Sequence, residues 1–338
     1  MISNYKNIKI ITTYKIYGAD KWDESVDFID LPPKQIKHKN KILYKLTRIK
    51  EDLSLIVSFF LARGQYDILV TNSERSGNLF AIFQGIFGKK IHHVMVNCFW
   101  NYPPNNLFKF FRQIYFKFVS KGVDKFIVFT PHEIESYHAI FNIPKDKMAF
   151  IHMYVTPLHT NCAPTKGNYI FSAGNPHNRD FPTLLNAVND LSIRVKIVTQ
   201  TPEYFFCKKI PPNVEILSLT KDGFFDCMAG SKLVIVVLKK GEIRSAGQRT
   251  YLDAMYLGKP VIVCDDKGAF NYITNGEDGI IVPSADVVSL KNAIIKLLSS
   301  EENMNNIAQK AQIKAKEFTV DKTMLGILTL IEEVVNKK

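Results

Sequence analysis

The stretch from Ser245 to Pro283 constrains the fold more than any other part of the sequence. Gly247 opens a predicted helix that runs through Tyr256, because apolar side chains recur there near helical spacing. Gly258 ends this helix, and an apolar strand follows at Val261–Cys264. A small-residue turn that leads into a helix leaves backbone N–H groups unpaired beside the positive end of the helix dipole. The pattern predicts a site that holds phosphate, and an ordinary packing unit of strand, turn and helix is the alternative.

Strands and helices alternate along the rest of the chain, which is typical of parallel sheets with covered faces. The segment Val155–Asn168 contains two prolines and small polar residues, and this composition predicts a linker between domains. With 338 residues, 46% of them hydrophobic, the chain is long enough to bury two separate cores. The sequence therefore predicts an α/β protein of two domains.

The sequence carries no pattern of secretion or of membrane spanning. No apolar run approaches the roughly 20 residues that a membrane-spanning helix needs, and the first residues form a strand pattern rather than a signal peptide. The five cysteines are scattered without a CxxC pair, which favours reduced thiols over a disulfide framework or a zinc site. These features predict a cytoplasmic protein.

Two segments resemble glycosyltransferase family 4 and its relatives of the GT-B fold. The run LDAMYLGKPVIV, followed by KGAFNYITNGEDGIIVPSADVVSLKNAI, is similar to the C-terminal signature of that family. The run YIFSAGNPHNRDFPTLLNAV, at Tyr169–Val188, resembles the strand, glycine turn and basic residue that open its donor-binding domain. The similarity covers residues 165 to 315.

The resemblance implies a GT-B fold, in which two Rossmann-like domains face each other across a cleft. It implies an N-terminal acceptor-binding domain at residues 1–160 and a C-terminal nucleotide-sugar-binding domain at residues 161–318. A terminal helix at residues 319–338 is expected to pack back on the first domain. The implied activity is transfer of a sugar from a nucleotide-sugar donor.

Such a transfer needs groups that stabilise negative charge on the departing diphosphate. The motif around Asp265–Asp266 is similar to the metal-free family, so neither a metal nor another cofactor is expected. Arginine is favoured because its planar fork can bind phosphate bidentately. Arg179 follows the turn at Gly174 and Asn175, and it matches the region where the family places a phosphate-binding arginine or lysine. The alternative for Arg179 is a surface residue that pairs with Asp180.

The turn before the predicted helix supplies the other expected donor-binding groups. The backbone amides of Ala246–Gln248 are expected to hold the diphosphate. The family's usual arginine directly after the glycine is replaced here by Asn175, so Arg244 or Arg249 is expected to supply that contact, unless these side chains are simply solvated. Asp253 stands where the family usually has a glutamate that hydrogen-bonds the donor ribose.

Two further positions depart from the family pattern. A family glutamate near the donor sugar is replaced by Ser245, and the nearby Glu242 either substitutes for it or is an exposed loop carboxylate. The family often has a histidine at the end of a strand in the first domain, and Asn97 takes this place as a candidate to hydrogen-bond a sugar hydroxyl. The pair His92–His93 at the start of that strand is expected to be structural, because adjacent strand residues point to opposite faces. Arg179, Asn97 and Glu242 are the expected catalytic residues.

The net charge of +12 lies mostly in the first half of the chain. The segment Lys34–Lys50 carries seven Lys or Arg, and Asn106–Lys125 interleaves aromatic and basic residues at helical spacing. A helix of this kind can lie on an anionic lipid surface, and a core helix whose lysines extend into water is the alternative. No nucleic-acid-binding motif accompanies the charge.

The sequence predicts a glycosyltransferase, cytoplasmic or peripheral on the inner face of the cytoplasmic membrane, with a lipid-linked or polysaccharide acceptor. No general base stands out, and retention of the anomeric configuration, as in family 4, needs none. A GT-B-like protein that binds a nucleotide sugar or glycan without turnover is the alternative. A nucleic-acid-binding protein is the third reading, from charge alone.

Overall fold

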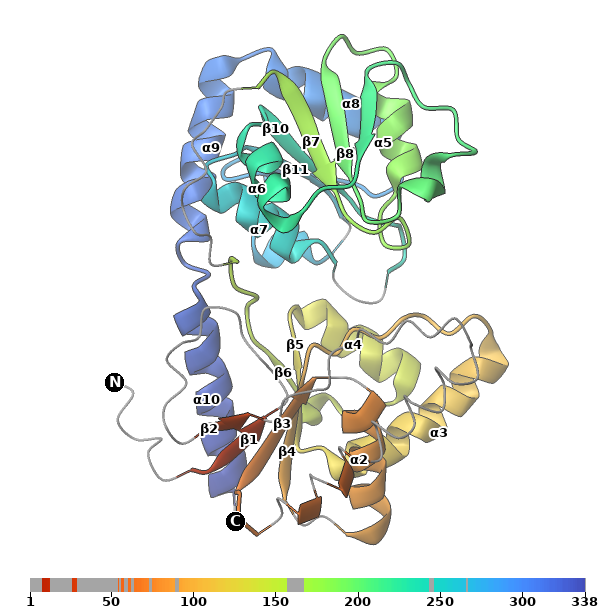
Figure 1. Ribbon diagram of the computed structural model, residues 1–338, viewed down its shortest axis with the longest axis vertical. Helices are drawn as coiled ribbons and strands as arrows, with labels where there is room; N and C mark the ends of the chain where they lie inside the picture. The colour runs from red at the N-terminus through yellow and green to blue at the C-terminus, as the bar shows by residue number, and fades with distance from the viewer. Residues whose placement is uncertain are drawn as a thin grey trace. The chain divides into compact units, whose positions relative to one another are not determined.

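The computed structural model describes residues 8–12, 26–28, 54, 56–57, 60–61, 64–72, 75–88, 91–156, 167–242, 246–265 and 267–337. The chain divides into two compact units (Figure 1). Unit 1 comprises Met1–His152 with Thr323–Lys338, and unit 2 comprises Met153–Lys322. The basic segment Lys34–Lys50 and most of the predicted linker lie outside the described residues.

Unit 2 begins a few residues before the predicted boundary because the segment Met153–Thr156 bonds to unit 2. The backbone N–H of Met153 donates to the Tyr272 hydroxyl at 3.0 Å, and that of Val155 donates to the Phe318 carbonyl at 2.9 Å. These contacts assign the end of the predicted first domain to the second unit.

Unit 1 is built on a parallel sheet whose described strands stand in the order β2-β1-β3-β4-β5-β6. Buried apolar residues fill most of β3 and of the neighbouring β4, as expected for strands covered on both faces. The strands are β1 (Ile10–Thr12), β2 (Val26–Phe28), β3 (Ile68–Asn72), β4 (His92–Val96), β5 (Lys125–Val128) and β6 (Met148–Phe150).

The helices of unit 1 begin and end at recognisable local signals. Thr130 and Glu133 form a capping box at the start of α4, with Pro131 in the first turn. Asn105 caps α3 by accepting a hydrogen bond from the Phe108 N–H at 3.0 Å. The described helices are α2 (Arg75–Phe87), α3 (Asn106–Gly122), α4 (Pro131–Phe141), the 3-10 helix η1 (Lys145–Lys147) and α10 (Val320–Asn336), whose residues from Thr323 belong to this unit.

An aromatic cluster forms the core between α3, α4 and the sheet of unit 1. The Trp100 ring packs against the rings of Phe116 and Tyr137, at centroid distances of 4.4 and 4.9 Å. The Tyr137 hydroxyl is buried and donates to the Cys98 carbonyl at 2.5 Å. The buried face of α3 is therefore fixed against the body of the unit.

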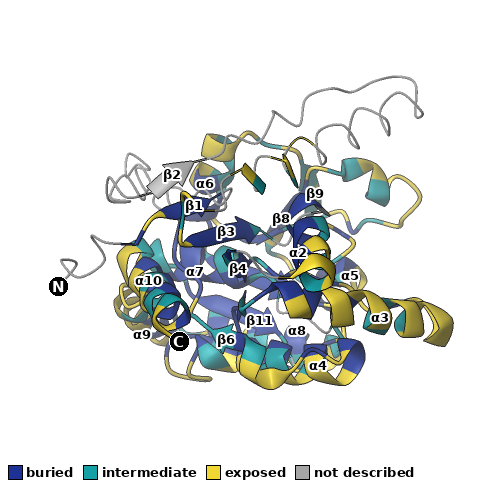
Figure 2. Ribbon diagram, turned by 90° about the horizontal axis from the view of Figure 1, so that it is seen from below, coloured by how far each residue is buried: buried dark blue, intermediate teal, exposed yellow. Residues whose placement is uncertain are grey.

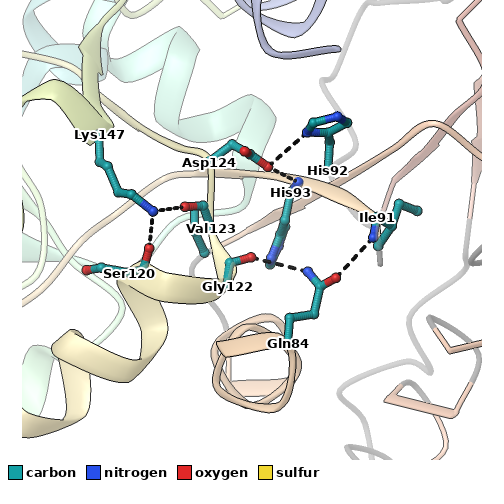
Figure 3. A network of polar contacts seen from close by, with 9 residues as sticks. All are labelled: Gln84, Ile91, His92, His93, Ser120, Gly122, Val123, Asp124 and Lys147. Atoms are coloured by element: carbon teal, nitrogen blue, oxygen red, sulfur yellow. Dashed lines mark hydrogen bonds and ion pairs between the residues drawn. The ribbon is translucent and has the colours of Figure 1, made fainter. Parts of the chain in front are cut away.

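A polar network ties the C-terminal end of α3 to the start of β4 (Figure 3). Lys147 donates to the backbone carbonyls of Ser120 and Val123, where a cation also complements the helix dipole. Gln84 donates to the Gly122 carbonyl and accepts from the Ile91 N–H, both at 3.2 Å. The network satisfies the backbone groups that the end of α3 leaves unpaired.

The histidine pair on β4 contributes to the same network. His92 lies 3.4 Å from the Asp124 carboxylate through Nδ1, and the His93 N–H donates to that carboxylate at 2.8 Å. His93 is buried and its Nε2 lies 2.9 Å from the Thr71 hydroxyl. The two histidines contact different neighbours, and these contacts agree with the expectation that both are structural.

Unit 2 is built on a second parallel sheet, in the order β12-β11-β10-β7-β8-β9. The strand order reverses direction between β7 and β10, which are neighbours in space but separated by two strands in sequence. The strands are β7 (Tyr169–Ala173), β8 (Arg194–Val198), β9 (Val214–Leu217), β10 (Leu233–Val237), β11 (Val261–Cys264) and β12 (Ile280–Val282).

The helices of unit 2 pack an apolar core against this sheet. Phe181, Leu184 and Val188 of α5 meet Leu290, Ile294 and Leu297 of α8 in one buried cluster. The described helices are α5 (Phe181–Val188), η2 (Pro202–Phe205), α6 (Lys221–Ala229), α7 (Gln248–Tyr256), η3 (Ala269–Asn271), α8 (Val287–Leu298) and α9 (Glu301–Ala315). The predicted bounds of α7 and β11 agree with the structure.

Candidate functional site

The candidate site of unit 2 lies at the carboxyl ends of β7 and β10. Ligands of open parallel sheets bind outside the carboxyl ends of the strands, at the point where the strand order reverses. Here β7 ends at Ala173 and continues into the Gly174 turn, while β10 is followed by Leu238 and the segment that leads to α7. The predicted donor-binding turn at Gly174 and the predicted turn before α7 therefore both follow strands that end at this edge.

Arg179 joins the two strand ends. Its backbone forms an antiparallel bridge with Leu238, next to the end of β10. Its Nε donates to the Ala173 carbonyl at 2.9 Å, at the end of β7, and its Nη2 lies 3.5 Å from the Thr250 hydroxyl of α7. The side chain is 6% exposed, so the alternative of a surface arginine is wrong.

Gly174 makes room for this guanidinium. A Cβ atom at Gly174 would lie 2.6 Å from Nε and 2.8 Å from Cζ of Arg179, closer than real Cβ atoms approach. The residue also has φ of 135°, a conformation that favours glycine. The glycine turn and the arginine therefore form one structural unit, as the resemblance to the family predicts for a phosphate site.

The N-terminal end of α7 lies against the same guanidinium. Gly247 precedes the helix with φ of 84°, and within the part of the chain that the structure describes no side chain caps the first turn. A Cβ at Gly247 would lie 2.8 Å from Cγ1 of Val236 and 3.5 Å from Nη2 of Arg179. The side chain of Gln248 is buried, and its Nε2 has no hydrogen-bond partner among the described residues. A buried unsatisfied donor is costly, and an anionic or carbonyl oxygen would satisfy it.

Two sources of positive potential meet at this point. The Arg179 guanidinium is permanently charged, and the first turn of α7 carries the positive end of its dipole. The arrangement attracts an anion with several oxygen atoms, such as a phosphate.

Comparison with known proteins agrees with this geometry. Residues 168–300 match the family model of glycosyl transferases group 1, and this range contains both strand ends, Arg179 and α7. The match lies within unit 2 and covers fewer than half of the residues of the chain.

The glycosyl transferase domain also has a curated relative. An exopolysaccharide phosphotransferase of Streptomyces coelicolor is 31% identical over 111 residues, which are 32% of this chain. The matched part is 12% of that protein, so the chain spans about an eighth of its relative's length.

Solved structures extend the likeness from the glycosyl transferase domain to the whole chain. Sucrose-phosphate synthase from Thermosynechococcus elongatus superposes with a TM-score of 0.66 at 15% identity, over 93% of this chain and 84% of that one. HepE of Anabaena, in a crystal structure with UDP, has a TM-score of 0.68 at 15% identity, over 91% and 86%. A glycosyltransferase from Rickettsia africae has a TM-score of 0.65 at 16% identity, over 97% and 90%. The predicted GT-B fold, with its two parallel α/β sheets, is confirmed.

The other predicted residues around the glycosyl transferase site differ in how far the structure describes them. Asn175 is exposed in the turn after Gly174, and its Oδ1 accepts from the His177 N–H at 2.9 Å. Glu242 is half-buried and follows Gly241 in the segment between β10 and α7. Arg244 and Ser245 lie outside the described residues.

Arg249 is one of two arginines expected to contact phosphate at the turn before α7. Its side chain instead packs against the segment Met153–Tyr154. Its guanidinium carbon lies 4.7 Å from the centre of the Tyr154 ring, and its Nη2 lies 3.7 Å from the Met153 sulfur. The physical reason is local: a planar cation stacks well on an aromatic face. In this arrangement Arg249 contributes its backbone amide to the first turn of α7, and its side chain holds Tyr154.

Asp253 bonds to a segment that sequence reasoning did not connect with it. Its two carboxylate oxygens accept from the N–H and the hydroxyl of Thr156, at 2.7 and 2.9 Å. Burial raises the pKa of this carboxyl to about 6, against the hydrogen bonds from Thr156 and the nearby charge of Arg249, which lower it. A ribose hydroxyl would therefore share the carboxylate with Thr156. No local signal around Thr156 indicates this contact.

Asn97 belongs to unit 1 and is described within that unit. It follows β4 with φ of 54°, and its Nδ2 donates to the Asn72 Oδ1 at the end of β3, at 2.8 Å. Two amide side chains therefore sit together at the carboxyl ends of neighbouring strands, which is where α/β sheets bind ligands.

Among the described residues, no three His, Cys, Asp or Glu side chains gather in a way that could hold a metal ion. Asp265 instead accepts from the backbone N–H groups of Lys267 and Ala269, at 3.1 and 2.5 Å. Across the same part of the chain, no helix combines the length and the apolar character needed to cross a bilayer.

The pKa of Asp253 leads to a prediction about stability. A folded-state pKa of about 6, above the unfolded value of about 3.9, gives stability that is present below about pH 4 and is lost as pH rises through about 6. The difference in free energy of unfolding between the natural protein and Asp253→Asn should fall by about 3 kcal/mol over that window. Urea denaturation at several pH values measures it.

The matched control is Asp222→Asn, at an exposed carboxyl of α6. It shows how the same measurement responds to removal of an exposed carboxyl of unit 2. A difference for Asp253→Asn that stays constant with pH would show that this carboxyl does not titrate with a raised pKa.

Proposed function

We propose that the protein is a glycosyltransferase that takes its sugar from a nucleotide-sugar donor bound at the carboxyl ends of β7 and β10. One observation carries the proposal: the guanidinium of Arg179 lies beside the uncapped first turn of α7, inside the domain that matches group 1 glycosyl transferases. These groups suit a diphosphate because it presents several anionic oxygens to them.

The proposed chemistry is stabilisation of the leaving group. When the bond between the sugar and the diphosphate breaks, negative charge accumulates on the diphosphate oxygens. Arg179 and the backbone N–H groups at Gly247 and Gln248 are already held in place, so they stabilise that charge without reorganising. We propose that this set replaces a metal ion, that the reaction retains the anomeric configuration, and that Glu242 and Asp253 contact the sugar and ribose hydroxyls.

We propose a class of donor from the comparison with a solved structure, and a class of acceptor from the sequence. HepE of Anabaena has been crystallised with UDP and with UDP-glucose, and this favours a uridine nucleotide among the donors to try first. The acceptor we propose is a lipid-linked or polysaccharide glycan. A cytoplasmic location at the inner face of the membrane follows from the same proposal, and the free thiols of the four described cysteines agree with it.

A panel of nucleotides tests donor binding. The melting temperature of the purified protein is measured with UDP, GDP, ADP and their sugars, with and without a chelator, because a ligand that binds only the folded state raises it. The proposal expects a rise with one nucleotide family that the chelator leaves unchanged. A rise that needs added divalent metal would overturn the metal-free part.

Turnover separates the enzyme from a binding protein of the same fold. Transfer of labelled sugar to an acceptor panel, or slow hydrolysis of the donor in its absence, supports the enzyme. Tight binding of the donor without any turnover on the whole panel would favour the binding protein instead. The anomeric configuration of the product, read by NMR, tests retention.

A further inference from the structure

The outward face of α3 in unit 1 is apolar, which is unusual for a surface helix. Seven large side chains on this face are between 36% and 63% exposed. They are Leu107, Phe108, Phe110, Phe111, Ile114, Tyr115 and Phe118. Soluble proteins rarely expose a contiguous apolar patch of this size unless it binds something. We call this surface the α3 face.

The sequence explains how one helix can be apolar outside and still pack inside. Positions 107, 111, 114 and 118 follow the helical spacing of one stripe, while Phe116, Val119 and Ser120 form the buried stripe on the opposite side. The reading of α3 as a core helix is therefore wrong for most of its aromatic residues. The buried stripe is narrow, and most of α3 has the colour of exposed residues in Figure 2.

The α3 face is held rigidly. A Cβ on Gly122 would lie 1.8 Å from the Ala81 carbonyl oxygen, and one on Gly85 would lie 2.6 Å from the Phe118 carbonyl oxygen, so α2 and α3 touch backbone to backbone. Lys147 binds the last carbonyls of α3 from the other side (Figure 3). The exposed aromatic residues belong to an anchored helix.

Charge indicates what covers this face. All four charged side chains of α3 are basic, and its first turn contains no acidic residue. Lys117 and Lys121 are exposed, and Lys121 Nζ lies 5.7 Å from the centre of the Phe118 ring. A second copy of the chain would bring the same four cations together across a symmetric contact. An anionic lipid surface complements them, and it also accepts aromatic side chains at the headgroup level.

We propose that the α3 face docks the protein on an anionic membrane surface, with its aromatic residues inserted at the headgroup boundary and Lys117 and Lys121 bound to lipid phosphates. Tyr102, 60% exposed just before the helix, adds a ring with a polar tip of the kind enriched at such boundaries. The inference concerns unit 1 alone and stands apart from donor binding in unit 2.

Vesicle flotation tests the docking with the full chain. The protein is mixed with phosphatidylcholine vesicles or with vesicles that also contain phosphatidylglycerol, at low and at raised salt. We expect binding to the anionic vesicles that weakens with salt. The double variant Phe111→Ser with Phe118→Ser should lower the partition coefficient at least tenfold, by removing the centre of the apolar stripe.

Matched variants distinguish binding through the α3 face from non-specific binding through other exposed residues. Phe206→Ser removes an 80% exposed aromatic ring of unit 2 and should leave vesicle binding unchanged. Lys117→Gln with Lys121→Gln should abolish the preference for the anionic lipid. Lys310→Gln with Lys316→Gln, which removes two exposed lysines of unit 2, should not.

A fluorescent probe reports insertion directly. The emission of F111W should shift to shorter wavelength on adding anionic vesicles, and that of F206W should not. The nucleotide-induced rise in melting temperature, measured on every variant, reports unit 2 independently, so failure of docking and failure of donor binding are distinguishable.

Two outcomes would overturn the proposal. Equal vesicle binding by the natural protein and by the Phe111 and Phe118 double variant would show that another surface binds lipid. Absence of vesicle binding, together with a dimer in sedimentation that the same double variant abolishes, would assign the α3 face to a second copy of the chain.

Discussion

Replacing Arg179 with alanine is expected to weaken nucleotide-sugar binding by about 10- to 100-fold, because a hydrogen bond to a charged group contributes about 1.5–3 kcal/mol. Turnover should fall further, by about 100- to 1,000-fold, because the guanidinium faces charge that grows in the transition state. Isothermal titration with the nucleotide and initial rates of sugar transfer measure the two effects.

The same substitution should also lower stability, and this effect needs separate measurement. Without the guanidinium, the Ala173 carbonyl loses its Nε donor and a cavity opens beside Gly174. Arg179→Lys keeps a charge but has only one nitrogen, so it cannot bond to Ala173 and reach an anion at α7 together. We expect an intermediate affinity from this variant.

Arg194→Ala is the matched control, because Arg194 is exposed at the opposite, amino-terminal end of β8. It should change neither affinity nor rate. If Arg179→Ala binds the nucleotide normally and only melts earlier, then Arg179 is structural and the proposed leaving-group chemistry is wrong.

Gly122→Ala is expected to lower the free energy of unfolding of unit 1 by about 3 kcal/mol or more. Helix propensity alone would favour alanine by about 1 kcal/mol. The new Cβ would, however, meet the backbone of α2, with the Ala81 carbonyl oxygen at 1.8 Å and its carbonyl carbon at 2.6 Å. Backbone cannot rotate away as a side chain can, so the two helices must separate.

The control for this substitution is Gly223→Ala in α6. There the nearest atom to a new Cβ is the Thr220 hydroxyl oxygen at 3.4 Å, an ordinary contact. This variant should be neutral or slightly stabilised. Urea denaturation followed by circular dichroism compares the two, and equal stabilities would mean that α2 and α3 tolerate a wider spacing than the structure indicates.

Local signals explain which elements the sequence predicts well. Gly247 and Gly258 delimit α7, and Thr130 with Glu133 defines the start of α4, because each signal acts within one helical turn. The fold class follows in the same way from the alternation of apolar strands and helices. These features need no knowledge of distant contacts.

The misjudged features depend on contacts between distant parts of the chain. The burial of Arg179 results from its bridge with Leu238, and the hydrogen bonds of Asp253 go to Thr156, 97 residues away. The period of α3 shows that the helix has an apolar stripe, but not that α2 packs against the C-terminal end of α3 at Gly122. Periodicity describes a helix, and packing decides which face is covered.

The division of the chain has a consequence for its synthesis. Unit 2 is one continuous segment, Met153–Lys322, whereas unit 1 also needs Thr323–Lys338. In α10, Ile327 and Ile331 are buried, and Gly326 packs beside Ile151. Domains fold as units while the ribosome extends the chain. Unit 1 is therefore translated first, but it cannot complete its fold until α10 is made, after the whole of unit 2.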